Sequence, residues 1–197
     1  DQKLNYKGDF YTYEDVPVAL DSFQKPHPPL WYGVHSLDSA ARAARNGHNV
    51  LSLDDAALTR TLTDSYRAAR TESGKDREPE PKIGIGRFIV LADSDEEAMS
   101  IAQRGYTMWH ESFNYLFRLR GSKPRHPRAP TFDGLCAEGQ GMAGSPETII
   151  DYLSNEMSVS GANYLVSQFS FGSLTQQETV RSIELFADRV MPALRGA

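Results

Sequence analysis

Hydroxyl side chains stand where a short apolar run gives way to an alanine-rich, helix-like segment. The run ends at Val34, and Ser36, Asp38 and Ser39 follow it. In parallel α/β proteins, ligands bind at the carboxyl ends of strands, where the backbone N–H groups at the start of a helix favour a phosphate. The same residue types also cap helices that bind nothing. The spacing alone therefore leaves two interpretations open, an anion site and a plain helix cap.

Arg87 is a second candidate binding residue, because it is a charge within the otherwise apolar run 83–92. It can pair with a carboxylate or reach an anionic ligand. Gly84 and Gly86 form a Gly-x-Gly in the same run, but Ile89 stands where a dinucleotide-binding fingerprint needs its third glycine. We therefore interpret the two glycines as small residues on a crowded strand face.

Several kinds of chemistry are not expected from this sequence. The histidines have no metal-binding spacing, so no metal site is predicted. Cys136 has no basic partner at a fixed spacing, and we do not expect it to act as a nucleophile. A net charge of −5 argues against a nucleic-acid partner or an anionic membrane, although residues 118–128 are rich in Lys and Arg.

The cellular compartment follows from similar observations. The single cysteine excludes an internal disulfide and indicates a reducing environment. The sequence has neither an apolar run of transmembrane length nor a signal-peptide pattern at its start. We therefore expect a cytoplasmic protein.

The candidate residues lie in a repeated order of strand-like and helix-like segments. Strands are expected at 30–34, 49–53, 82–92 and 164–169, and helices at 38–46, 54–71, 93–117, from 145, and at 176–194. This order is typical of parallel βα units, and four such units make half of an eight-stranded barrel. The first twenty residues predict either a surface β-hairpin or a loop that packs against sequence absent from this chain.

The segment 118–144 has no clear periodicity, and we expect it to be a long irregular insert. A loop longer than about 15 residues inside a compact domain is usually an active-site lid or disordered. We predict a mobile lid over the ligand site, within a single domain that spans residues 1–197.

Three segments together resemble the bacterial luciferase-like flavin monooxygenases. The stretch QKPHPPLWYGVHSLDSAARAARNG is similar to that family's fifth strand and to the Ser-bearing turn before its next helix. The stretch IGRFIVLADSDEEAMSIAQ resembles the seventh strand and helix. Residues 144–195, which begin GSPETII and end VMPALR, are similar to the family's C-terminal end.

The resemblance implies an α/β fold, the C-terminal half of a (β/α)8 TIM barrel with strands five to eight. It also implies that reduced FMN, or a deazaflavin in one branch of the family, binds at the C-terminal face of the barrel. The flavin phosphate would lie at Ser36, the backbone of Leu37, and Ser39, and Trp109 would point toward the flavin pocket. Arg87 joins these residues as a candidate cofactor contact.

The first four βα units of the family barrel are absent from this sequence. In the family they supply much of the flavin ring pocket and commonly a catalytic His or Cys, so no catalytic residue is assigned here. We expect either that the chain belongs to a longer protein or that a partner completes the barrel. A second copy could be that partner, which would give a homodimer.

The function implied by the resemblance is that of a two-component, flavin-dependent monooxygenase. A separate flavin reductase would supply reduced FMN, which with O2 oxygenates a small organic substrate. Two alternatives stay open. One is a deazaflavin-dependent dehydrogenase of the same fold, and the other is a non-catalytic flavin-binding or assembly protein.

Overall fold

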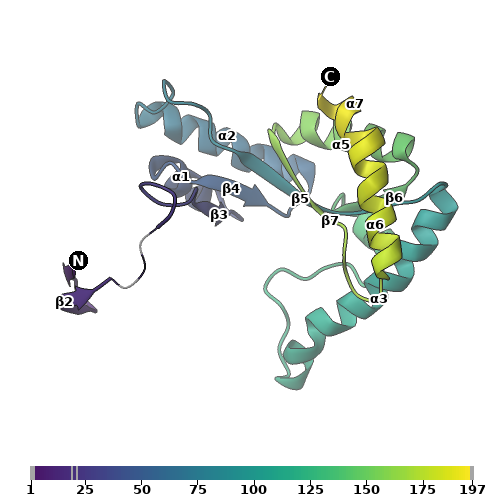
Figure 1. Cartoon of the computed structure of the whole chain (residues 1–197), viewed down its shortest axis with the longest axis horizontal. Coiled ribbons are helices and arrows are strands. Elements are labelled where there is room, and N and C mark those ends of the chain that lie inside the picture. Colours follow the sequence, from purple (N-terminus) through teal and green to yellow (C-terminus); the bar gives the residue numbers. More distant parts are fainter. Residues whose placement is uncertain (1–2, 19, 21, 196–197) are drawn as a thin grey trace. The chain divides into compact units, whose positions relative to one another are not determined.

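A computed structural model describes residues 3–18, 20 and 22–195 of the chain (Figure 1). The chain divides into two compact units, residues 1–30 and 31–197. In the first unit β1 (Lys3–Lys7) and β2 (Thr12–Pro17) pair in antiparallel fashion, so the β-hairpin, one of the predicted alternatives, is present. The hairpin presents an aromatic surface of exposed side chains: Tyr6, Phe10, Tyr11 and Tyr13.

The second unit is built on a parallel sheet of five strands. The four predicted strands are present as β3 (Trp31–Gly33), β4 (Asn49–Ser52), β5 (Ile83–Leu91) and β7 (Tyr164–Gln168). β4 and β7 both pair with the first part of β5, and β6 (Gly141–Gly144) pairs with the last part. The sequence does not predict β6, because GMAG lacks the β-branched and aromatic residues that are typical of strands.

The segment 118–144 is not irregular throughout, so that part of the prediction is wrong. It contains the helix α4 (Phe132–Ala137) and ends in β6. Apart from the short turn before β6, only residues 120–131 lack regular structure. We call this stretch loop 120–131, and it is the part of the insert to which the lid prediction now applies.

Helices follow the strands, and polar side chains fix where they begin. They are α1 (Leu37–Arg45), α2 (Ala56–Glu72), α3 (Asp95–Leu119), α5 (Pro146–Ser160), α6 (Gln176–Leu185) and α7 (Met191–Arg195). A Ser, Thr or Asp side chain accepts a backbone hydrogen bond at the start of α1 to α6. The helix predicted at 176–194 is interrupted by a π-helical turn, Phe186–Val190. In the described part of the chain, no helix is long and apolar enough to cross a bilayer.

β5 is the centre of the second unit and is buried along its whole length (Figure 1). Ile83 packs with apolar residues of α1 and α2, and Ile89 and Leu91 pack with those of α5 and α6. On the opposite face, Phe88 and Val90 pack with side chains of α3 and α4. β5 therefore holds together both layers of helices.

Glycines on β5 make room for large side chains of neighbouring strands. A Cβ atom at Gly84 would lie 3.4 Å from the Trp31 ring, and one at Gly86 would overlap the side chain of Leu53. The Trp31 ring also contacts Tyr164 of β7, with 5.2 Å between ring centroids. The interpretation of the two glycines as small residues on a crowded strand face is therefore confirmed.

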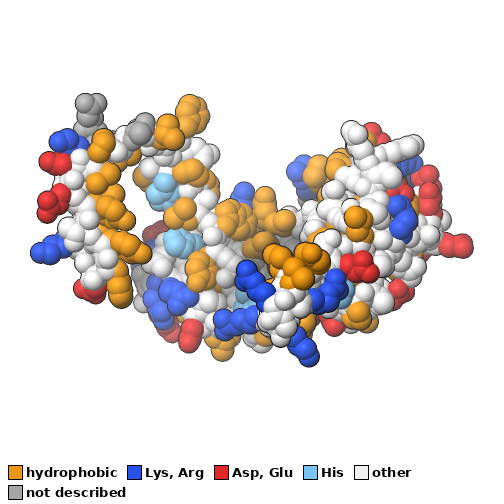
Figure 2. Space-filling view, turned by 90° about the horizontal axis from the view of Figure 1, so that it is seen from below, with side chains coloured by type: hydrophobic (Ala, Val, Ile, Leu, Met, Phe, Trp, Pro, Cys, Tyr) orange, Lys and Arg blue, Asp and Glu red, His pale blue; other side chains and the backbone are white. Residues whose placement is uncertain are grey.

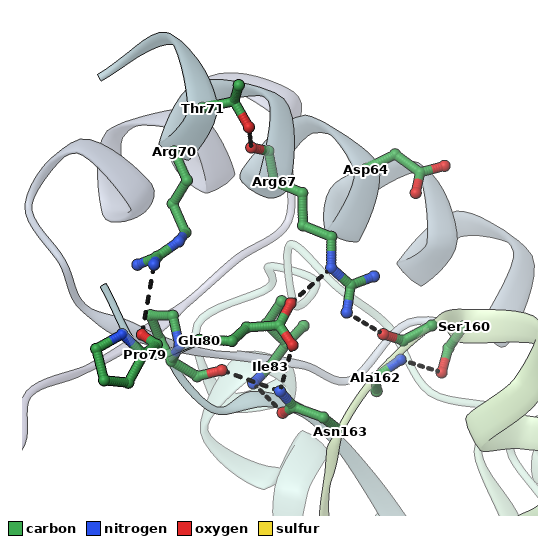
Figure 3. A network of polar contacts seen from close by, with 12 residues as sticks. Asp64, Arg67, Arg70, Thr71, Pro79, Glu80, Ile83, Ser160, Ala162 and Asn163 are labelled. Carbon is green, nitrogen blue, oxygen red and sulfur yellow. Dashed lines mark hydrogen bonds and ion pairs between the residues drawn. The ribbon is translucent and has the colours of Figure 1, made fainter. Parts of the chain in front are cut away.

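A polar network ties the beginnings of β5 and β7 to α2 (Figure 3). Arg67 donates to Glu80 at 2.7 Å and to the carbonyl oxygen of Gly161 at 3.0 Å. Asn163 donates to Glu80 at 3.3 Å and accepts from the N–H of Ile83 at 2.7 Å. These contacts lie at the amino ends of the strands, the end that contributes stability in barrel proteins.

The sheet is open at its sides. Among the described residues, no strand pairs with the outer edges of β3 and β7. Apolar side chains beside the β5 glycines are also well exposed, Trp31 at 41% and Leu53 at 37%. Parallel sheets normally have both faces covered. The described strands therefore form a partial barrel whose inner face is accessible.

Candidate functional site

A cavity of about 290 Å³ lies at the carboxyl ends of the parallel strands. His35 and Leu53 follow β3 and β4, Gln168 ends β7, and loop 120–131 contributes His126 and Arg128. The other lining residues come from β5, β7, α3 and the turn before β6: Gly86, Arg87, Phe88, Val166, Trp109, Phe113 and Gln140. Ligands of parallel α/β folds bind at this end of the strands, so the cavity is the candidate site.

The start of α1, directly after His35, is closed by a capping box. Ser36 Oγ accepts from the N–H of Ser39 at 3.2 Å, and Ser39 Oγ accepts from the N–H of Ser36 at 3.1 Å. Ser39 Oγ donates its own proton to the carbonyl oxygen of Ser36 at 2.8 Å. Ser36 is therefore a helix cap, which agrees with the cap interpretation; Asp38 lies in the first turn and is not the cap.

The same helix start keeps free hydrogen-bond donors. The N–H groups of Leu37 and Asp38 have no acceptor among the described residues, as is usual in the first turn of a helix. The Ser36 hydroxyl accepts a bond within the cap and still has its own proton to donate. Ser39 by contrast holds the cap in place. The predicted phosphate site thus has three donors available, one hydroxyl and two backbone amides.

The Arg87 side chain is occupied by a carboxylate. It donates to Glu156 of α5 at 2.8 Å and to the carbonyl oxygen of Gly86 at 2.8 Å. The Arg87 side chain is 0% exposed and that of Glu156 is 7% exposed. Of the two partners that the sequence suggests for Arg87, the geometry favours the carboxylate, and a contact between Arg87 and a cofactor stays an unsupported prediction.

Trp109 belongs to an aromatic wall of the cavity. Its ring stacks on Phe113 of the same helix, with 5.1 Å between centroids and 10° between planes. Phe88 of β5 meets Trp109 edge-on at 4.9 Å. All three residues line the cavity, and such packed rings offer a rigid apolar surface to a flat ligand.

Three residues that the sequence analysis passes over also meet at this site. His35 Nδ1 lies 3.3 Å from Asp54 Oδ2, and the His35 ring stacks on that of His126 with 4.3 Å between centroids. His35 and Asp54 each stand two residues after a strand, β3 and β4. That position is a signal available in the sequence. His126 lies in loop 120–131, where no periodicity indicates its partners.

Loop 120–131 is attached to the body of the second unit near the cavity. Arg128 donates to the carbonyl oxygen of Leu53 at 3.1 Å and also to the side chain of Gln140. Tyr106 of α3 donates to the carbonyl oxygen of Ala129 at 2.9 Å. These bonds hold the C-terminal part of the loop, from Arg128 onward.

The beginning of loop 120–131 is more exposed. Figure 2 shows Lys and Arg side chains gathered around hydrophobic ones on the face where α3 ends. Leu116 and Leu119 are 60% and 65% exposed there. Residues 120–127 are therefore the accessible part of the loop, and the mobile lid stays a prediction for them.

Other reactive groups do not gather at the cavity. Among the described residues, no three His, Cys, Asp or Glu side chains are placed to hold a metal ion. Cys136 is partly buried in the core, and burial, together with the nearby Asp133 carboxylate, raises the pKa of its thiol to about 11. A thiol of this kind is a poor nucleophile at neutral pH.

Comparison with known sequences gives a family match. A sequence model described as luciferase-like monooxygenase matches residues 1–163. An uncharacterized protein of Sinorhizobium fredii (strain NBRC 101917 / NGR234), y4wF, is 34% identical over 172 residues, which are 87% of this chain and 50% of the relative. The chain thus spans about half the length of this relative.

Solved structures share the fold. Monooxygenase RslO1 from Streptomyces bottropensis superposes with a TM-score of 0.76 at 22% identity, over 98% of this chain and 56% of that one. The oxygenating constituent of 3,6-diketocamphane monooxygenase from Pseudomonas putida, in complex with FMN, superposes with a TM-score of 0.68 at 16% identity, over 98% of this chain and 58% of that one. A coenzyme F420-dependent tetrahydromethanopterin reductase from Methanopyrus kandleri superposes with a TM-score of 0.63 at 14% identity, over 95% of this chain and 57% of that one. The predicted fold, a partial luciferase-like barrel, is confirmed.

Proposed function

This chain belongs to the luciferase-like monooxygenase family, and we propose that it forms the flavin-phosphate half of an enzyme that uses reduced FMN and O2 to oxygenate a small organic substrate. The observation that carries the proposal is the pair of free N–H groups at Leu37 and Asp38. They follow shortly after His35, which lines the cavity at the carboxyl ends of the parallel strands. Helix starts of this kind favour a phosphate, because their N–H groups and dipole both attract an anion.

The residues of this chain would bind and orient the cofactor. Ser36 would donate its hydroxyl proton to the phosphate, Leu37 its N–H, and Ser39 would keep the helix cap in place. Trp109 would supply a flat apolar surface. Reduced flavin supplies the two electrons with which one atom of O2 enters the substrate and the other leaves as water. Loop 120–131 would keep bulk water from the site.

The proposal extends to partners and location. Because the chain spans about half of its relatives' length, the activity of a whole enzyme needs the remaining strands, from a longer chain or from a second copy in a homodimer. A separate reductase would deliver reduced FMN, and the protein would be cytoplasmic, with FMN and NAD(P)H at hand. No catalytic residue is proposed within residues 31–195 for the oxygen chemistry.

A deazaflavin-dependent dehydrogenase is the second candidate function. The similarity to the coenzyme F420-dependent reductase supports it, since that enzyme has the same fold. In this case, a hydride would pass between the deazaflavin and the substrate, and O2 would take no part. The two candidates differ in which cofactor binds: FMN for the first, and a deazaflavin for the second. A chain that binds flavin and forms assemblies without turnover is the remaining alternative.

The first experiment is a titration of the 197-residue chain with FMN, followed by quenching of flavin fluorescence, with riboflavin and coenzyme F420 as parallel ligands. Light scattering on the same samples gives the mass of the species that binds. We expect saturable binding of FMN that is tighter than that of riboflavin, because only FMN carries the phosphate. Equal affinity for FMN and riboflavin would contradict the phosphate site, and preference for F420 would support the dehydrogenase.

A further inference from the structure

The side chains that line the cavity are unevenly divided by charge. The lining includes two arginines, two histidines and two glutamines, and no carboxylate among the described residues. The chain as a whole has a net charge of −5, so this composition is opposite to that of the protein. The cavity therefore has a local preference for an electron-rich or anionic ligand.

His35 is one of the polar groups that line the cavity. His35 comes from the end of β3 and is fixed by Asp54, whose carboxylate lies 3.3 Å from Nδ1. A carboxylate accepts at that distance only from a protonated nitrogen, so Nδ1 carries the hydrogen and Nε2 is left for a ligand.

Loop 120–131 adds two further polar groups to the lining. The His126 ring stacks on His35 at 4.3 Å, and the Arg128 guanidinium is held by the carbonyl oxygen of Leu53 at 3.1 Å. Arg87 also lines the cavity, but its charge is neutralised by Glu156. The charge that a ligand can meet is therefore that of Arg128, and the His35 and His126 rings are further hydrogen-bonding groups of the lining.

The lining also contains a group of packed aromatic rings. Phe88, Trp109 and Phe113 pack edge-on and face-to-face, and two of them belong to the same helix, α3. The volume of about 290 Å³ is at the lower limit of the range typical of small-molecule sites, roughly 300–1,000 Å³. A single ring with a short substituent fits this space.

We propose that the cavity binds a small aromatic molecule with an acidic oxygen, a carboxylic acid or a phenol, as the organic substrate of the enzyme. The ring would lie on Phe113, next to the Trp109 surface that is proposed for the flavin, and the oxygen would meet Arg128, His35 and His126. To call this ligand the substrate rests on the proposed function, because only an oxygenase would oxygenate it. The binding itself is a property of the residues described here.

Isothermal calorimetry with benzoate and benzamide tests the proposal on the 197-residue chain. The two probes share a ring of the same size, and only benzoate is ionised. We expect benzoate to bind at least about tenfold more tightly than benzamide, because charge-assisted hydrogen bonds add to the ring contact. The variants His35→Gln and His126→Gln should each reduce this preference toward equal affinity.

His27→Gln is the matched control, because His27 is an exposed histidine outside the cavity lining. It should leave benzoate affinity unchanged, and thermal unfolding of every variant checks that each has folded. Equal affinity for the two probes, no binding of either, or an equal loss in His27→Gln would overturn the inference. FMN titrations of the same proteins separate the two proposals: FMN binding without benzoate binding contradicts only the substrate class, and the reverse contradicts only the flavin function.

Discussion

At the start of α1, Ser36 caps the helix whether or not an anion is present, so removing its side chain would disturb both properties. The bond from the N–H of Ser39 to Ser36 Oγ is the cap, and the Ser36 hydroxyl proton is the donor available to a phosphate. A carboxylate can accept the first bond but cannot supply the second. The substitution Ser36→Asp therefore separates capping from phosphate binding.

We expect Ser36→Asp to fold with unchanged stability, since Asp is as good a cap as Ser, and to bind FMN at least about tenfold more weakly because of charge repulsion. Riboflavin binding should change little. Unfolding in urea and the two flavin titrations measure these effects. Asp38→Asn in the same turn is the control that should not weaken FMN binding. An equal loss for both flavins would contradict a phosphate site at α1.

The buried pair of Arg87 and Glu156 gives a second prediction at this scale. Arg87→Met should leave the Glu156 carboxylate without its partner in a site where it is 7% exposed. Breaking such a pair costs about 3–5 kcal/mol in the free energy of unfolding. Arg60→Met, which removes an exposed partner of Asp64, should cost less than about 1 kcal/mol. If urea unfolding gives a similar decrease in the free energy of unfolding for the two variants, the buried pair contributes no more to stability than the exposed pair.

At the scale of elements, loop 120–131 has one accessible part and one attached part. Limited trypsin digestion should cut first after Arg120 or Arg125, which lie in the exposed part. Arg128 should resist, because its side chain bonds to Leu53 and Gln140. Mass spectrometry of the first fragments identifies the sites. First cuts in α2 or in the segment 73–82 would contradict the lid.

The network at the amino ends of the strands predicts a dependence on pH. Arg67 lowers the pKa of Glu80 below its ordinary value of 4.5, chiefly by its hydrogen bond. A carboxylate with a lowered pKa in the folded state stabilises the protein above that ordinary value, and the stabilisation is lost as the pH falls through the lower folded-state pKa. The effect is small, because both side chains are more than a third exposed.

Glu80→Gln is the variant that measures this contribution. Its free energy of unfolding should be lower than that of the original chain at pH 7, and the gap should close in acid below pH 4.5. Glu72→Gln, at the exposed end of α2, is a control that should show no such gap. If the difference in free energy of unfolding between Glu80→Gln and the original chain stays constant from pH 7 to strongly acidic solution, its cause is not the contact with Arg67.

The sequence predicts the elements with strong patterns and misses those that depend on neighbours. The four main strands and the capped helices follow from apolar runs and from Ser, Thr and Asp at helix starts. β6 has no such pattern, since it is a strand only because β5 pairs with it. The π-helical turn at 186–190 likewise has helical residues throughout, and only its hydrogen bonding differs.

The candidate site was predictable to a similar degree. Trp109 lines the cavity, and the α1 serines follow His35, which also lines it; their contact with a flavin stays a prediction. Arg87 could not be assigned from the sequence, because its partner Glu156 is 69 residues away. The contact between His35 and His126 joins a strand end to an irregular loop, and no spacing in the chain indicates it.

For the whole molecule, the open edges of the sheet predict association. A groove of about 640 Å³ lies between β7, α5 and the C-terminal helices, and it includes Leu165, Phe186 and Leu194. Exposed edges and apolar grooves bind other chains. The mass from light scattering should therefore rise with concentration, and Leu194→Glu should reduce that rise. Leu119→Glu, at an exposed position on α3, is the control. A constant monomer mass would contradict association through the groove.

The contact between Trp31 and Tyr164 has a consequence for the fluorescence of the protein. The chain has two tryptophans. Trp31 begins β3 and packs on Tyr164, the first residue of β7, whereas Trp109 lines the cavity at the other end of the strands. Their emission therefore comes from two separate environments within one unit. In Trp109→Phe, the fluorescence of Trp31 would report when β3, β5 and β7 come together around Gly84 during folding. In Trp31→Phe, the fluorescence of Trp109 would report when a ligand enters the cavity. The two variants could therefore time folding and ligand binding separately.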